Sequence, residues 1–242
     1  MRVTLLRNGT GSHPVSFFDD IAKKLRLRMH RHLFDFGYDA SRSVETATVL
    51  FPEQLELEGQ NAAHAVQYEP TPIKLFGHLL RRLAHNFDFS HFVFVDIGSG
   101  KGRMLLLAAE WPFQRVEGVE LARMLHQIAS RNLTRPDTEG RGLAPVVLHN
   151  MDASTYRFPD EPLVVYLFNP FDFAVLTQVH NNLRRSLQQN PRECVVIYVN
   201  SKHREVFDQD RSFEEIPRTR KQRLLEILLS PWQIAVYRTR SP

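Results

Sequence analysis

The feature that most constrains this chain is the segment of residues 92–103, which reads FVFVDIGSGKGR. Its first four residues form a short run of aromatic and β-branched side chains that glycine soon interrupts, which predicts a buried parallel strand. Residues 104–111 then favour a helix, which Pro112 ends. The three glycines therefore lie in a strand-to-helix turn, where glycine permits positive φ and lets a ligand contact the main chain.

Three classes of nucleotide ligand bind at turns of this kind. A phosphate-binding P-loop needs a hydroxyl residue after its lysine, but Lys101 is followed by Gly102. A dinucleotide fingerprint, G-x-G-x-x-G, places glycine or alanine where this chain has Arg103. Asp96 adds a carboxylate, which repels a pyrophosphate and attracts a cationic group. The pattern therefore favours S-adenosylmethionine, which carries an ammonium and a sulfonium and no phosphate.

The second predicted strand, residues 116–119, ends at Glu120, about 20 residues beyond the glycine turn. A carboxylate in this position accepts hydrogen bonds from the two vicinal hydroxyls of an adenosine ribose. The second strand of an NAD enzyme ends in the same way, so Glu120 leaves a nucleotide-dependent oxidoreductase open. An ordinary surface glutamate at a strand end is the structural alternative.

VDIGSGKGR and VEGVELA resemble motifs I and II of the class I S-adenosylmethionine-dependent methyltransferase superfamily. The resemblance covers about residues 68–240 and implies an α/β, doubly wound, Rossmann-like fold with a seven-stranded sheet and helices on both faces. A third predicted strand, residues 145–148, leads into NMDA at residues 150–153, which resembles the turn that meets the adenine amino group. The cofactor-binding residues that the two motifs and this turn imply are Asp96, Gly98, Ser99, Gly100, Glu120, Asp152 and Ala153.

The fourth predicted strand, residues 163–168, runs directly into Asn169-Pro170-Phe171. Methyltransferases that modify amino nitrogens have Asn/Asp-Pro-Pro-aromatic here. The resemblance implies a catalytic role for these three residues and cofactor contact for Asn169: the amide oxygen orients the target nitrogen, proline stiffens the turn, and the ring covers the acceptor. In this chain Phe171-Asp172 replaces Pro-aromatic, which leaves a protein amine, another amine or a different nucleophile open. A simple strand end with Phe171 packed inward is the structural alternative.

Tyr68-Glu69-Pro70-Thr71-Pro72 precedes a predicted helix at residues 73–83. This segment resembles the loop with which non-SET histone lysine methyltransferases cap their cofactor, a distant likeness. The pattern is most similar to bacterial members of the superfamily that share YxPTP and the strand-four NPF motif and have no assigned substrate. Tyr68, Glu69 and Thr71 are therefore candidate cofactor contacts. Alternatively, Thr71 caps the helix and Pro72 occupies its first turn.

Composition limits the class of protein. The 242 residues, 43% hydrophobic and 24% charged, are typical of a soluble globular chain. No apolar stretch approaches the roughly 18 residues of a membrane span, so we expect no membrane partner. A single cysteine, Cys194, indicates a reducing, cytoplasmic compartment, and the eleven histidines form no metal signature.

We expect two parts: a helical N-terminal cap over residues 1–67 and a cofactor-binding domain over residues 68–242. The cap contains a main helix at residues 16–33 and a turn at residues 36–38. Positive charge is concentrated at residues 23–32 in a chain of net charge +4. A basic face of this kind can bind nucleic acid, an acidic protein or a ribosome. Apolar residues near helical spacing favour an ordinary solvated face instead.

Beyond the fourth strand, the pattern predicts a helix at residues 173–188, a strand at residues 193–199, and closing antiparallel strands at residues 213–216 and 224–237. Asn200, Ser201 and Lys202 follow the fifth strand and are weaker substrate-side candidates. The sequence thus predicts an S-adenosylmethionine-dependent methyltransferase acting on an amino nitrogen. A protein amine is favoured over a nucleobase or a small molecule. The alternatives are a nucleotide-dependent oxidoreductase and a cofactor-binding module without transfer activity.

Overall fold

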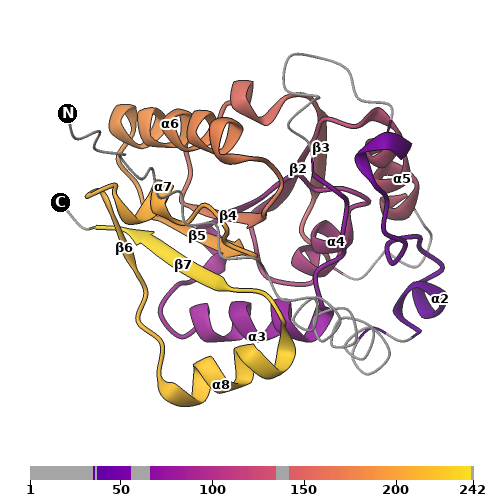
Figure 1. Ribbon diagram of the computed structural model, residues 1–242, viewed down its shortest axis with the longest axis horizontal. Helices are drawn as coiled ribbons and strands as arrows, with labels where there is room; N and C mark the ends of the chain where they lie inside the picture. Colours follow the sequence, from indigo (N-terminus) through magenta and orange to yellow (C-terminus); the bar gives the residue numbers. More distant parts are fainter. Residues whose placement is uncertain (1–34, 36, 56–65, 135–141, 241–242) are drawn as a thin grey trace, which may run out of the picture.

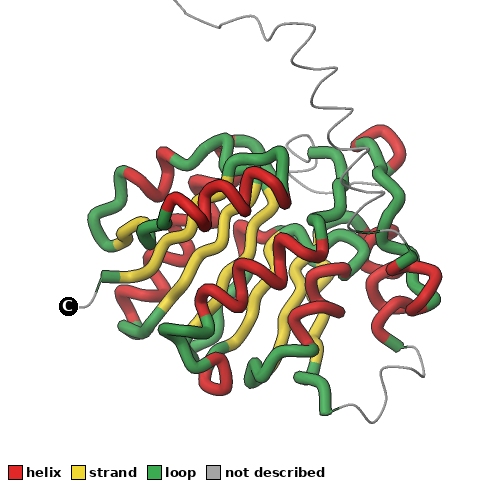
Figure 2. Tube along the Cα trace, turned by 90° about the horizontal axis from the view of Figure 1, so that it is seen from below, coloured by secondary structure: helices red, strands yellow, loops and turns green. Residues whose placement is uncertain are grey.

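The computed structural model describes residues 35, 37–55, 66–134 and 142–240, which form a seven-stranded sheet between layers of helices (Figures 1 and 2). The strand order is β3-β2-β1-β4-β5-β7-β6. β1 to β5 pair in parallel, whereas β7 is antiparallel to both β5 and β6. The predicted Rossmann-like fold class is therefore confirmed. The strands are β1 (Val93–Ile97), β2 (Arg115–Glu120), β3 (Val146–Asn150), β4 (Leu163–Phe168), β5 (Cys194–Val199), β6 (Phe213–Glu215) and β7 (Ile234–Thr239).

Helices cover both faces of the sheet. One face packs against α3, α4 and α8, and the other against α6 and α7 (Figure 1). α5 lies beside β2 and β3. Successive strand residues point to opposite faces, so Phe94 packs with α3 while Val95 packs with α6. The helices are α2 (Tyr38–Arg42), α3 (Ile73–Leu83), α4 (Arg103–Ala109), α5 (Arg123–Leu133), α6 (Phe173–Gln189), α7 (Glu205–Asp208) and α8 (Arg220–Leu229).

One predicted strand is wrong over its first half. Residues Arg220–Leu229 form α8, and β7 begins at Ile234. The helix starts with a capping box: the Thr219 hydroxyl accepts the Gln222 N–H at 3.2 Å, and the Gln222 side chain accepts the Thr219 N–H at 2.8 Å. The leucines that follow are strong helix formers, and all but Leu229 are exposed, so this apolar run does not mark a buried strand.

The predicted helix at residues 16–33 and the basic stretch within it lie outside the described residues. The later part of the predicted cap contains the short helix α2, which follows Gly37 at φ 80°, and a 3-10 helix at Pro52–Gln54. Among the described helices, none has the length and apolarity needed to cross a membrane.

Candidate functional site

A pocket lies at the carboxyl ends of β1, β2 and β4. β1 pairs with both β2 and β4, so this is the position where the order of the sheet reverses and where ligands bind in open α/β sheets. Carboxyl ends of parallel strands share one edge, which is why residues far apart in sequence meet here. The predicted residues that line the pocket are Tyr68, Glu69, Thr71, Asp96, Gly98, Ser99, Gly100, Glu120, Asp152, Ala153, Pro170 and Phe171.

Two buried carboxylates dominate the electrostatics of the pocket. Asp96 is 3% exposed and Glu120 is 8% exposed. Burial, with a smaller contribution from the charge of Glu120, raises the pKa of Asp96 well above its usual range. Burial also raises the pKa of Glu120, although backbone N–H groups oppose the rise. Within the described part of the chain, no basic side chain forms an ion pair with either residue. A cationic ligand would therefore supply the positive charge that these two carboxylates lack.

Backbone hydrogen bonds fix the carboxylate of Glu120. Its two oxygens accept the N–H groups of Gly100 and Ala122, each at 2.8 Å. Each carboxylate oxygen can accept a further bond, so a pair of ligand hydroxyls can still be held. Asp152 is fixed in a similar way, because its carboxylate accepts the Ser154 N–H at 2.8 Å and caps the 3-10 helix Ala153–Thr155.

The protein itself packs tightly against the glycine turn. A Cβ on Gly98 would lie 2.5 Å from Cβ of Pro170, and a Cβ on Gly100 would lie 2.2 Å from Cε2 of Tyr68. Both glycines also have positive φ, 78° and 54°. They are thus required by the packing of the chain, in addition to the ligand contact that the sequence predicts. A ligand that contacts the main chain at Gly100 would lie beside the Tyr68 ring.

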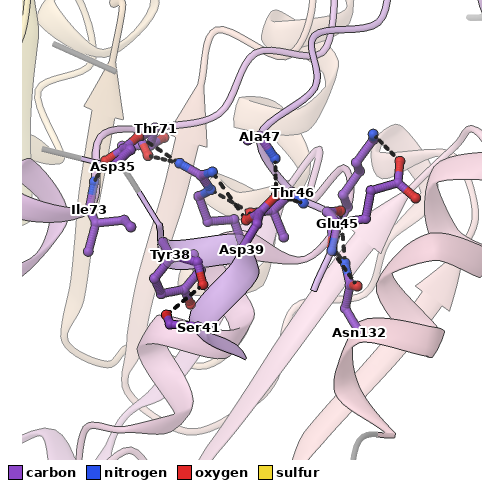
Figure 3. Close-up of polar contacts among 12 residues, drawn as sticks. Asp35, Tyr38, Asp39, Ser41, Glu45, Thr46, Ala47, Thr71, Ile73 and Asn132 are labelled. Atoms are coloured by element: carbon purple, nitrogen blue, oxygen red, sulfur yellow. Dashed lines mark hydrogen bonds and ion pairs between the residues drawn. The ribbon is translucent and has the colours of Figure 1, made fainter. Parts of the chain in front are cut away.

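Arg103, which follows the glycine turn, anchors a segment that the sequence did not connect with it. We call residues 35 and 37–47 the N-terminal strap. The Arg103 guanidinium donates to Asp35 Oδ2 and to Thr46 Oγ1, each at 2.7 Å, and lies 3.6 Å from Asp39 (Figure 3). Tyr68 links the strap to the pocket wall, because its hydroxyl donates to the Thr46 carbonyl at 2.8 Å.

Lys101 anchors the same strap from within the turn. Its ammonium donates to Glu45 at 2.7 Å, and its side chain is 1% exposed against 55% for Glu45. Sequence reasoning used Lys101 and Arg103 only to exclude other ligands. A signal was available, because the residues that follow Arg103 in its helix, MLLLAA, are all apolar, and a helix that is apolar all round is buried. Such an arginine needs acidic partners, although only the tertiary structure identifies them.

Thr71 does not cap α3. Its hydroxyl hydrogen-bonds the Tyr166 hydroxyl at 2.6 Å, both side chains being buried. The first N–H of the helix, at Ile73, is instead accepted by Asp35 Oδ1 at 3.0 Å. The capping alternative for Thr71 is therefore wrong, since a carboxylate from the strap takes that place.

Asn169 is not part of the pocket lining. It lies in an adjoining hollow with Pro52, Asn200 and Lys202, and the hollow shares Glu69 and Phe168 with the pocket, among others. Asn169 and Asn200 follow neighbouring parallel strands and have φ of 40° and 52°, a conformation that costs energy in residues other than glycine. The Tyr198 hydroxyl donates to Asn169 Oδ1 over 3.4 Å. Asn169 is thus grouped with the substrate-side candidates Asn200 and Lys202 rather than with the predicted cofactor residues.

In the described ranges, no three or more His, Cys, Asp or Glu side chains are grouped to hold a metal ion.

No protein-family model matches this chain, and no curated protein sequence matches it. Similar solved structures include ribosomal protein L11 methylase from Lactobacillus delbrueckii subsp. bulgaricus, with 14% identity, 70% of this chain and 78% of that chain covered, and a TM-score of 0.44. The Escherichia coli protein yhhF, described as a candidate methyltransferase, has 15% identity, 81% and 100% coverage, and a TM-score of 0.47. The glycopeptide N-methyltransferase MtfA has 11% identity, 69% and 90% coverage, and a TM-score of 0.48. These are remote likenesses, and the fold described above rests on the strand order itself.

Proposed function

We propose that this chain is an S-adenosylmethionine-dependent methyltransferase. The observation that carries the proposal is that Asp96 and Glu120, 3% and 8% exposed, both line the pocket at the glycine turn and form no ion pair with a basic side chain of the described chain. The cofactor supplies a methyl group on a positively charged sulfonium, which suits such a site. A pyrophosphate at the glycine turn would meet the carboxylate of Asp96, which disfavours the nucleotide-dependent oxidoreductase.

Each wall of the pocket has a role in this proposal. The backbone of Gly98, Ser99 and Gly100 holds the methionine part beside Asp96, and Glu120 accepts the ribose hydroxyls. Asp152 and Ala153 receive the adenine. Tyr68, Glu69 and Thr71 close the opposite wall. Backbone hydrogen bonds already orient Glu120 and Asp152, so binding needs little rearrangement of these side chains.

We further propose that the acceptor is an amino nitrogen, on a protein side chain or another amine, in the cytoplasm. Pro170 and Phe171 line the pocket, whereas Asn169 lines the adjoining hollow, so the turn after β4 separates the two. An acceptor in the hollow would donate its N–H to Asn169 and direct its lone pair toward the pocket. Transfer by in-line displacement depends chiefly on this alignment.

Cofactor binding is tested by calorimetry with S-adenosylmethionine, S-adenosylhomocysteine and NADH. We expect the first two to bind and NADH not to bind. Asp96→Asn should weaken S-adenosylmethionine binding by about tenfold or more, because a charge-assisted interaction is lost. Asp160→Asn is the matched control, since Asp160 is exposed and outside the pocket. NADH binding without S-adenosylhomocysteine binding would reverse the assignment.

Transfer is tested by incubating a cell lysate with cofactor that carries a radiolabelled methyl group. We expect label in protein or in an amine-containing fraction. Asn169→Ala should retain cofactor affinity and lose transfer, while Asn181→Ala, at an exposed position of α6, should change neither. Unchanged transfer by Asn169→Ala would remove this residue from the mechanism. Cofactor binding with no label in any fraction would support the binding module instead.

A further inference from the structure

The connection between β6 and β7 is longer than the sheet requires. Antiparallel neighbours can be joined by a hairpin of a few residues. Here residues 216–233 separate the two strands and include α8, which extends beneath the sheet beside α3 (Figure 1). The strand pairing does not account for this helix, so its surface chemistry needs another explanation.

α8 turns a charged residue inward and apolar residues outward. Glu226 is 4% exposed, and its carboxylate pairs with Arg82 at 2.8 Å and with Arg218 at 3.2 Å. Leu229 is buried against the core at 8% exposure, whereas four other aliphatic side chains of the helix are exposed. Their exposed fractions are Leu224 67%, Leu225 39%, Ile227 56% and Leu228 61%. Contiguous exposed apolar side chains of this kind mark an interaction surface rather than scattered surface residues.

The same helix is cationic where it is exposed. Arg220, Lys221 and Arg223 are exposed near its N-terminus, where the helix dipole adds positive potential. Glu226 is the one acidic residue in the helix sequence, and it is buried and paired. The α8 surface, as we call these exposed side chains, therefore combines basic and aliphatic groups. It consists of Arg220, Lys221, Arg223, Leu224, Leu225, Ile227 and Leu228.

We propose that the α8 surface binds the interface of an anionic lipid bilayer without crossing it. Acidic headgroups complement the three basic side chains, and the upper acyl region receives the four aliphatic ones. α8 forms an outer edge of the molecule (Figure 1), and a deformable lipid surface accepts such a ridge without a preformed groove.

Other occupants satisfy these observations less well. A second copy would bring like-charged helices together with no exposed acid on α8 to neutralise them. Nucleic acid would neutralise the charge but leave the leucines in water. Protein interfaces concentrate their binding energy in Trp, Tyr and Arg, with Leu under-represented, whereas the apolar part of this surface is Leu and Ile alone.

This inference revises the expectation of no membrane partner. That expectation rested on the lack of a spanning stretch, which needs about 20 apolar residues. A helix that lies in the interface needs only one short apolar face with basic neighbours.

The test is flotation of the full chain with phosphatidylcholine vesicles, with or without phosphatidylglycerol. We expect binding to the anionic vesicles alone. Arg223→Glu should lower the partition coefficient about fivefold or more, from the contribution of one basic residue near an anionic surface. Leu224→Ser with Leu228→Ser should abolish flotation. The matched controls, Arg185→Glu on α6 and Val147→Ser on β3, change exposed residues elsewhere and should bind like the unmodified chain.

Several outcomes would overturn the inference. One is the absence of flotation with anionic vesicles. Another is an equal loss in Arg223→Glu and Arg185→Glu, which would indicate non-specific attraction. A dimer in light scattering that the leucine variant dissociates would assign the surface to a second copy, and retention of a lysate protein without vesicle binding would assign it to a protein partner. Thermal unfolding should show that every variant remains folded at the temperature of the assay, because each altered side chain is exposed.

Discussion

Replacing Asp35 by asparagine tests whether buried charge holds the N-terminal strap. Asparagine keeps an oxygen that can accept the Ile73 N–H, now bonded at 3.0 Å, so the start of α3 is preserved. The change removes the negative charge that lies 2.7 Å from the Arg103 guanidinium. Glu45→Gln is the matched control, because it neutralises a second strap carboxylate that lies 2.7 Å from Lys101.

The expected magnitudes differ because the two acids differ in exposure. The side chains of Arg103 and Asp35 are 3% and 9% exposed, so water screens their interaction poorly. Removing one partner of a buried ion pair costs about 3–5 kcal/mol. Arg103 keeps Thr46 at 2.7 Å and Asp39 at 3.6 Å, so we expect about 2–3 kcal/mol, at or just below the lower end of that range. Glu45 is 55% exposed, so water screens its charge, but the 1% exposed Lys101 is left with only the neutral glutamine oxygen. Neutralising Glu45 should therefore cost about 1–2 kcal/mol, less than at Asp35.

The assay combines urea unfolding with hydrogen exchange of the strap. Thr46 and Ala47 donate their N–H groups to Asp39 at 2.6 and 2.7 Å, so their exchange reports whether the strap is closed. Asp35→Asn should lower the free energy of unfolding and speed exchange at both amides more than Glu45→Gln does. Equal effects of the two variants, or a loss below about 1 kcal/mol for Asp35→Asn, would refute the argument from burial.

Three further predictions follow from the pocket and the sheet. The raised pKa values of Asp96 and Glu120 mean that their protonated forms stabilise the unliganded fold at low pH, and this contribution is lost as the pH rises through those values. The melting temperature of the unmodified chain relative to that of Asp96→Asn should therefore fall as the pH rises. Gly100→Ala should lower the free energy of unfolding in urea by about 3 kcal/mol or more, because the added Cβ would lie 2.2 Å from the Tyr68 ring. The control Gly142→Ala has a similar φ of 64° but nothing within 4 Å of the added Cβ, so it should cost about 1 kcal/mol. Equal losses in the two variants would contradict this prediction. Burial raises the pKa of the Cys194 thiol to about 12, so the reactive thiolate is scarce in the native protein. A colorimetric thiol reagent should therefore react with Cys194 in denaturant and not under native conditions.

Local pattern was sufficient for much of the scaffold. The predicted bounds of α3 and β4 agree with the structure, because apolar spacing and flanking proline act over a few residues. The grouping of Asp96, Glu120 and Asp152 in one pocket also follows from sequence order, since each comes at or just after the end of a parallel strand and those ends share an edge. Their roles toward a cofactor remain predictions.

Contacts between distant residues decided the rest. The leucines of α8 form an apolar run like that of a strand, and their exposure appears only when the chain packs. Arg103 and Asp35 are 68 positions apart, and no local pattern pairs them. Asn169 follows the pocket strand β4, yet its backbone conformation places it in the neighbouring hollow. The sequence by itself determined which groups reach the pocket edge of the sheet, because that depends on strand order. The tertiary structure alone decided which charges are buried together, because burial depends on what packs against them.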